Sequence, residues 1–185
     1  METVFVAGSI AIGTLAPEVV QRIETMVERE MAVVVGDADG ADSAIQACLL
    51  EAGATRVTVY CSGRSPRNNI GGWPVEQVFT SAAPGTRAFF TAKDVEMAQV
   101  ADYGLMIWDS RSTGTLSNII ELVARRRTSV VFVNKHKAFM TVGDVAALDR
   151  LVAVMSDSAR LKAETKMRLS KRIDALRSDQ LTMPV

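Results

Sequence analysis

Five short runs of this sequence are apolar at most consecutive positions rather than at alternate ones. They cover residues 3–7, 32–35, 56–60, 105–108 and 129–133. Strands buried on both faces have this pattern, which is typical of a parallel sheet covered by helices. Segments with helical spacing lie between the runs, and right-handed crossovers then give an α/β, Rossmann-like three-layer αβα fold. The pattern predicts a parallel sheet of about five or more strands, with further helices at the C-terminal end.

Helical spacing predicts helices over residues 17–30, 41–52, 93–101, 115–126 and 145–155. We assign residues 1–155 to the Rossmann-like domain and residues 156–185 to a C-terminal helical extension. The polar helix expected over residues 157–178 is rich in lysine and arginine. Its narrow apolar stripe consists of Leu161, Leu169, Ile173 and Leu176.

This extension has three interpretations: a solvated helix packed on the domain, a self-association surface, or a contact for nucleic acid. We favour self-association, because a narrow apolar stripe needs a partner surface, and we therefore expect a homo-oligomer.

Composition excludes several classes of function. The 21 Lys and Arg residues balance the 21 Asp and Glu residues, so the whole molecule has no net attraction for nucleic acid, which we do not expect as a partner. One histidine and two cysteines, Cys48 and Cys61, are too few for a multi-histidine metal site, a zinc site or a disulfide framework. No apolar run approaches the roughly 18 residues of a membrane span. The sequence also has no basic leader, so we expect a cytoplasmic protein that binds neither a membrane nor a metal.

Three strand ends carry glycine, hydroxyl and acidic residues. The first holds Gly8 and Ser9, the second Gly36, Asp37, Gly40 and Asp42, and the third Asp109, Ser112, Gly114, Thr115 and Asn118. In an open parallel sheet, ligands bind beyond the carboxyl ends of the strands, where the strand order reverses. We therefore expect these three segments to meet.

The chemistry of these segments suits a nucleotide. Glycine allows close backbone approach to a phosphate, and a helix that begins at Gly114–Thr115 presents free N–H groups to an anion. Carboxylates of Asp37, Asp42 or Asp109 can accept hydrogen bonds from ribose or base. One such loop alone is more often a simple turn or helix cap, but three at one sheet edge favour a ligand site. The G-x-G-x-x-G and Walker A patterns are both absent.

The polar stretch over residues 62–92 is unusually long for a connection within a domain. Arg64, Arg67, Asn68 and Asn69 could close over an anionic ligand, or could form an ordinary surface loop. Lys93 could reach a phosphate from the following helix.

Together, the segments VFVAGS (residues 4–9), VVGDADGAD (34–42), KDVEM (93–97) and IWDSRSTGTLSNI (107–119) resemble the SLOG superfamily. That superfamily groups the DNA-processing Smf/DprA proteins with the Lonely-guy (LOG) phosphoribohydrolases, and the YspA/YpsA-like branch is the most similar. The resemblance spans roughly residues 3–135 and implies a nucleotide-binding Rossmann-like domain that needs no other cofactor. Gly8–Ser9, Gly36–Asp37 and Gly114–Thr115 would then lie in the pocket.

The sequence departs from the phosphoribohydrolase pattern P-G-G-x-G-T-x-x-E. Asn118 occupies the place of the glutamate, Ser112–Thr113 replace the paired glycines, and Ile10 stands where many relatives have arginine. An amide cannot act as a general base at neutral pH. We therefore expect a sensor or binding protein for a ligand of the ADP-ribose, NAD or nucleoside monophosphate class.

The alternative is an N-glycosidic hydrolase or a deoxyribosyltransferase-like enzyme. Asp109 would be its catalytic carboxylate, assisted by Glu121.

Overall fold

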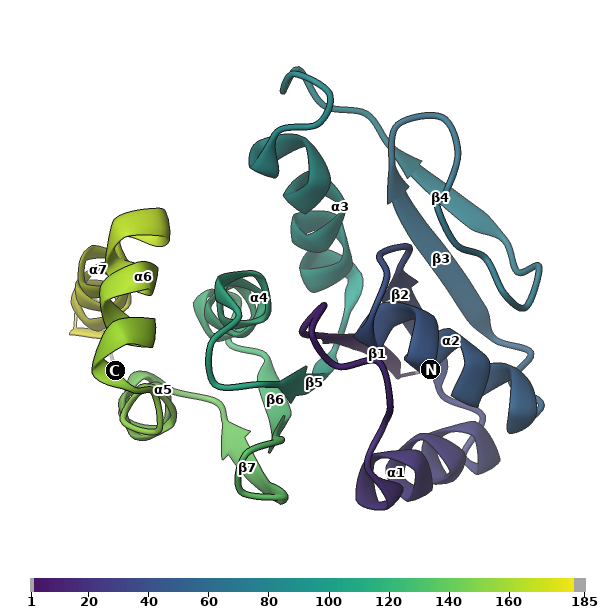
Figure 1. Cartoon of the computed structure of the whole chain (residues 1–185), viewed down its shortest axis with the longest axis horizontal. Coiled ribbons are helices and arrows are strands. Elements are labelled where there is room, and N and C mark those ends of the chain that lie inside the picture. The colour runs from purple at the N-terminus through teal and green to yellow at the C-terminus, as the bar shows by residue number, and fades with distance from the viewer. Residues whose placement is uncertain (1, 182–185) are drawn as a thin grey trace.

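A computed structural model of the chain describes residues 2–181, which form one seven-stranded sheet flanked by helices (Figure 1). The strand order is β4-β3-β2-β1-β5-β6-β7. Neighbouring strands pair in parallel except β6 and β7, which are antiparallel. The strands are β1 (Thr3–Gly8), β2 (Ala32–Gly36), β3 (Val57–Ser62), β4 (Val75–Val78), β5 (Tyr103–Trp108), β6 (Thr128–Val133) and β7 (Ala138–Val142).

Helices cover both faces of the sheet, which confirms the predicted three-layer α/β fold. One face carries α1 (Pro17–Glu28) and α2 (Ala41–Glu51). The other face carries α3 (Arg87–Val100), α4 (Thr113–Ala124), α5 (Val145–Val152), α6 (Asp157–Met167) and α7 (Leu169–Leu181). In Figure 1, α5, α6 and α7 lie beyond α4, at the end of the molecule opposite β3 and β4.

Strand β1 shows why apolar side chains at consecutive positions produce this architecture. Val4 and Val6 join the core beneath α1 and α2, whereas Phe5 and Ala7 join the core beneath α3 and α4. All four are buried, because successive side chains of a strand point to opposite faces. A central strand therefore supplies both cores at once.

The structure adds elements that the sequence pattern did not predict. Strand β4 and the first turn of α3 fall inside the expected loop of residues 62–92. Helix α3 begins at Arg87 because the side chain of Thr86 accepts a hydrogen bond from the backbone N–H of Phe89. Strand β7 follows a turn without glycine, in which Lys137 adopts a left-handed conformation with φ of 51°.

The expected long C-terminal helix is two helices. Arg168, with φ of 52°, ends α6 in a left-handed cap, and α7 follows at once. Leu169, Ile173 and Leu176 are buried in the same core as α4 and α5, whereas Leu161 is 70% exposed. Most of the apolar stripe is therefore covered within the chain, and self-association stays a prediction. None of the helices within residues 2–181 is both long and apolar enough to cross a bilayer.

Close packing of α2 on β1 depends on Gly8. A Cβ atom at Gly8 would lie 2.6 Å from the Cβ of Ala41 and 2.8 Å from the carbonyl oxygen of Ile107. We expect Gly8→Ala to lower the free energy of unfolding by about 1–3 kcal/mol, because the backbone of β1, β5 or α2 would have to move to make room for the added methyl group. Urea denaturation measures the change. Gly13→Ala is the control, since a Cβ there meets nothing within 4 Å; equal effects of the two substitutions would contradict the account.

Candidate functional site

The three predicted loops meet where the strand order reverses, between β1 and β5. The Ser9 hydroxyl, after β1, donates to Oδ1 of Asp109, after β5, over 3.0 Å. The same hydroxyl lies 3.3 Å from Oγ1 of Thr115, in the first turn of α4. Thr115 in turn donates to the Ser112 hydroxyl over 3.2 Å. A chain of hydroxyl groups, from buried Ser9 and Thr115 to partly buried Ser112, thus joins the ends of two strands to the start of α4.

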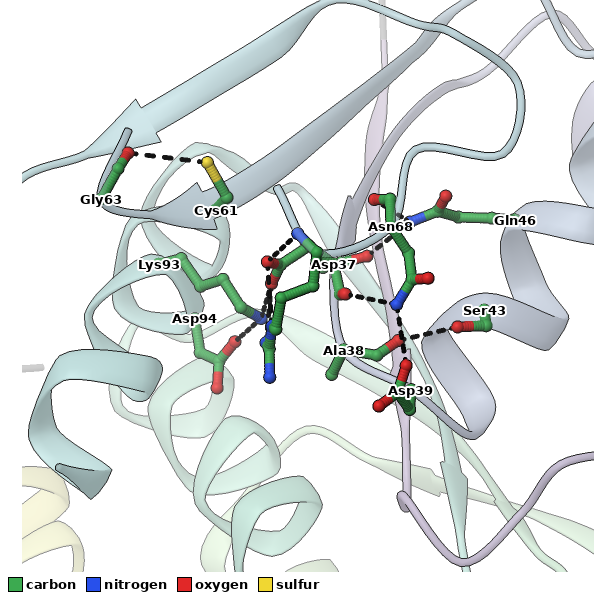
Figure 2. Close-up of polar contacts among 12 residues, drawn as sticks. Asp37, Ala38, Asp39, Ser43, Gln46, Cys61, Gly63, Asn68, Lys93 and Asp94 are labelled. Carbon is green, nitrogen blue, oxygen red and sulfur yellow. Dashed lines mark hydrogen bonds and ion pairs between the residues drawn. The ribbon is translucent and has the colours of Figure 1, made fainter. Parts of the chain in front are cut away.

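Next to this junction lies a buried group of charges centred on Lys93 of α3. Its ammonium group donates to Oδ1 of Asp94 over 2.9 Å and lies 3.8 Å from Oδ1 of Asp37, at the end of β2. Figure 2 shows Lys93 and Asp94 reaching from α3 toward Asp37. The negative charge of Asp42, near the start of α2, also raises the pKa of this lysine. The group therefore ties α3 to the ends of β2 and α2.

A glycine makes room for these charges. A Cβ atom at Gly36 would lie 2.5 Å from both the Lys93 ammonium nitrogen and Oδ2 of Asp42. Only a residue without a side chain allows both groups to occupy this space. This explains the glycine at the last position of β2, which the sequence predicts as a ligand contact.

Asp37 is held as a carboxylate. Burial by itself would raise its pKa, but hydrogen bonds from the Arg67 side chain and backbone, together with the charge of Lys93, lower the pKa below its usual value. Arg67 donates from both Nη2 (2.8 Å) and Nε (3.1 Å), and its backbone N–H adds a third bond of 3.0 Å. Asn68 donates to the Asp37 carbonyl oxygen and to Asp39 (Figure 2). The loop after β3 is thereby fixed over the end of β2.

Asp42 is in the opposite electrostatic situation. Burial raises its pKa to about 6, and the charge of Lys93 offsets this only in part. It is 6% exposed, and no side chain among residues 2–179 donates a hydrogen bond to it. The backbone groups of Ala38 and Gly8 also lower its pKa, by less than burial raises it. Its carboxylate therefore retains unused acceptor capacity.

These groups surround a pocket of about 350 Å³, within the range of small-ligand sites. Its wall is formed by the end of β1, the starts of α2 and α4, the loop after β3 and one face of α3. The lining residues are Ala7, Gly8, Ile10, Ala38, Asp42, Arg67, Phe90, Thr91, Lys93, Asp94, Ser112, Gly114, Thr115 and Asn118.

The start of α4 forms the side of the pocket that suits an anion. The first backbone N–H groups of a helix have no acceptor within the helix and carry partial positive charge. In α4 the Ser112 hydroxyl already accepts from the Thr115 N–H over 3.4 Å, which leaves the N–H groups of Thr113 and Gly114 for an anion. The hydroxyl groups of Ser112 and Thr115 lie beside them. Asn118, one turn further on, is 6% exposed, and its amide has no hydrogen-bond partner within the described part of the chain.

The structure brings six of the predicted ligand residues to the pocket wall. They are Gly8, Asp42, Ser112, Gly114, Thr115 and Asn118. Ser9, Gly36 and Asp37 lie immediately behind the wall, where they position its residues. Gly40, with φ of 74°, precedes α2 and lies against the backbone of Ile10.

The two carboxylates predicted for catalysis lie elsewhere. Oδ1 of Asp109 accepts hydrogen bonds from Ser9 and from the backbone N–H groups of Arg111 and Ser112, so this side chain braces the loop before α4. Glu121 pairs with Arg125 and with Arg172 of α7. Neither carboxylate lines the pocket.

Four charged or aromatic residues line the pocket without having been assigned to it from the strand ends. The sequence left open whether Arg67 and Lys93 contact a ligand, and it gave no sign that Asp94 and Phe90 do. They come from α3 and from the loop after β3, which reach the site only through tertiary packing. No cluster of three or more potential metal ligands occurs among the described residues.

Comparison with known proteins shows a likeness in fold. No model of a known protein family matches the chain, and no curated protein does. DNA processing protein A (DprA) from Helicobacter pylori matches with a TM-score of 0.51 and 16% identity, over 70% of this chain and 64% of that one. DprA from Streptococcus pneumoniae matches with a TM-score of 0.51 and 20% identity, over 70% of this chain and 50% of that one. The chain thus spans less than two thirds of either protein and shares their fold.

This likeness corrects one expectation. The H. pylori protein has a described mode of binding single-stranded DNA, so the exclusion of nucleic acid on the basis of zero net charge is wrong. Net charge averages over the whole surface, whereas binding depends on the local arrangement of charge. Here Arg67 lines the pocket, and Arg87 donates to the carbonyl oxygen of Thr113 at the start of α4.

The raised pKa of Asp42 predicts a pH-dependent stability. In the unfolded chain the carboxyl group ionises near 3.8, but in the folded protein near 6, so its contribution to stability is complete below 3.8 and is lost as the pH rises through 6. Asp42→Asn removes this loss. The free energy of unfolding of the variant minus that of the parent chain should therefore be about 1–2 kcal/mol larger at pH 7.5 than at pH 5. Urea denaturation at the two pH values measures it. A stability difference that is the same at both pH values would contradict the assignment.

Proposed function

We propose that this chain binds a nucleotide or nucleotide-derived ligand in the pocket at the start of α4, in a binding or sensing role. The phosphate would lie against the N–H groups of α4 and the hydroxyls of Ser112 and Thr115. The sugar would lie toward the carboxylates of Asp42 and Asp94, which repel phosphate but accept hydrogen bonds from hydroxyl groups.

The observation that carries this proposal is Asn118. Asn118 lines the pocket one helical turn from the start of α4, and its side-chain amide takes part in no hydrogen bond within the described part of the chain. The amide faces the pocket space rather than being sealed in the core, since the buried side-chain atoms without a partner among the described residues belong to Ser62 and Ser110. One amide offers a donor and an acceptor to a ligand there. A ligand that accepts and donates hydrogen bonds there would satisfy the amide.

We place the chain in the SLOG superfamily and its YspA-like branch on the sequence resemblance, which the shared fold with DprA supports. A cytoplasmic location and homo-oligomerisation belong to the same proposal. The bound nucleotide would be the only cofactor.

N-glycosidic cleavage is the less favoured role. A catalytic carboxylate must reach the reacting bond, and both Asp109 and Glu121 are engaged elsewhere. Release of free base from AMP by the parent chain, lost in Asp109→Asn, would establish the enzyme.

Isothermal titration calorimetry tests the binding proposal. We expect heat on titration with at least one of AMP, ADP-ribose, NAD and a cyclic nucleotide, and about tenfold weaker binding by Asn118→Ala, since one hydrogen bond contributes about 1.4 kcal/mol. Asn134→Ala is the matched control, because Asn134 lies outside the pocket and its side-chain oxygen accepts a hydrogen bond from Lys137. No heat with any of these ligands, and no nucleotide that co-purifies, would refute the proposal.

Single-stranded DNA is a second candidate ligand, favoured by the DprA fold and by Arg67 and Arg87 beside the pocket. It predicts that a labelled oligothymidine binds with an affinity that falls steeply with salt. Arg87→Ala should reduce the slope of log K against log salt by about one phosphate contact. Fluorescence anisotropy at several salt concentrations measures this slope, and absent or salt-independent binding would exclude the candidate.

A further inference from the structure

The pocket is chemically different at its two ends. The end at α4 offers N–H and O–H donors, whereas the floor beneath α3 holds the carboxylates of Asp42 and Asp94 with the ammonium group of Lys93 between them. Asp94 is engaged by Lys93 over 2.9 Å. Asp42 forms no ion pair within 4 Å among the described residues, so it is the acceptor at the floor with free capacity.

The mouth of the pocket is apolar. Ile10 is 69% exposed and Phe90 is 38% exposed, and both line the pocket. The Arg67 guanidinium lies 4.9 Å from the centre of the Phe90 ring, so cation and aromatic surfaces adjoin there. These surfaces suit the flat face of a nucleobase. A base at the mouth and a phosphate at α4 leave the sugar as the part that reaches Asp42.

We propose that Asp42 selects ribose over 2-deoxyribose by accepting hydrogen bonds from the 2′- and 3′-hydroxyl groups of the bound nucleotide. This inference rests on the proposed function and assigns its ligand class as a ribonucleotide. Ribose hydroxyls are donors that a carboxylate can accept together, and no side-chain donor of the described chain competes for Asp42.

The burial of Asp42 makes this selection strong. A carboxylate that is 6% exposed has little water to replace a missing partner. A deoxyribose would therefore leave the group desolvated and underbonded, and sites of this kind discriminate against a ligand that lacks one hydroxyl. A strand of DNA lacks the same 2′-hydroxyl, so the inference also predicts that DNA binds this pocket less well than a ribonucleotide does.

The test compares AMP with 2′-deoxy-AMP by calorimetry at pH 7.5. We expect the parent chain to bind AMP about 10- to 100-fold more tightly, as for a hydrogen bond to a charged group. In Asp42→Asn this preference should fall to within about threefold. Asp39→Asn is the matched control: it makes the same change three residues earlier, at a carboxylate that bonds Asn68 outside the pocket, and should keep the preference.

The outcomes separate the two claims. If AMP and 2′-deoxy-AMP bind the parent chain equally, the inference is overturned while nucleotide binding stands. If Asp42→Asn still binds AMP more tightly than 2′-deoxy-AMP, another group recognises the 2′-hydroxyl, and the inference is also overturned. If neither nucleotide binds but ADP-ribose or NAD does, the same comparison is made with the corresponding 2′-deoxy ligand. If no nucleotide binds, the proposed function fails and this inference fails with it.

Discussion

The ammonium group of Lys93 is the contact on which the site depends. It lies between the carboxylates of Asp94, Asp37 and Asp42, which belong to α3, the end of β2 and the start of α2. Burial by itself would lower the pKa of Lys93, but these carboxylates raise it above its usual value, so the lysine stays charged. A buried charge of this kind is stable only when it is paired, and the pairing fixes α3 across the edge of the sheet.

The same arrangement explains how a neutral chain acquires a site with two kinds of charge. Arg67 binds Asp37 with two side-chain hydrogen bonds, and Lys93 is shared among Asp94, Asp42 and Asp37. The pocket therefore presents the carboxylates of Asp42 and Asp94, with the Lys93 ammonium group between them, opposite the donors of α4. A ligand with an anionic end and a hydroxyl-bearing middle matches this polarity, whereas an inorganic phosphate matches only one end.

Much of the fold could be predicted because its signals are local. Apolar residues at consecutive positions identified the buried strands, and glycines at Gly8, Gly36 and Gly114 marked the edge where ligand residues gather. The hydroxyl and amide residues at the start of α4 could be predicted as ligand contacts because they come directly after that edge in the sequence. Strand β7 was missed because its turn contains lysines and a histidine rather than glycine.

The electrostatic half of the site could not be read from the sequence, because it depends on distances between segments. Lys93 and Asp37 are far apart along the chain, and nothing in either segment indicates that they lie 3.8 Å apart. Asp109 illustrates the converse: its position after a central strand suggests chemistry, but local backbone N–H groups occupy its carboxylate. Local pattern identifies candidates, and packing decides which of them face a ligand.

A crystal structure of the chain grown with AMP tests the central claim most directly. The account predicts density for one nucleotide in the pocket, with its phosphate on the first turn of α4 within hydrogen-bond distance of Asn118, and its ribose facing Asp42. A phosphate bound at the carboxylate floor, or a nucleotide bound at another surface while this pocket holds only water, would contradict it.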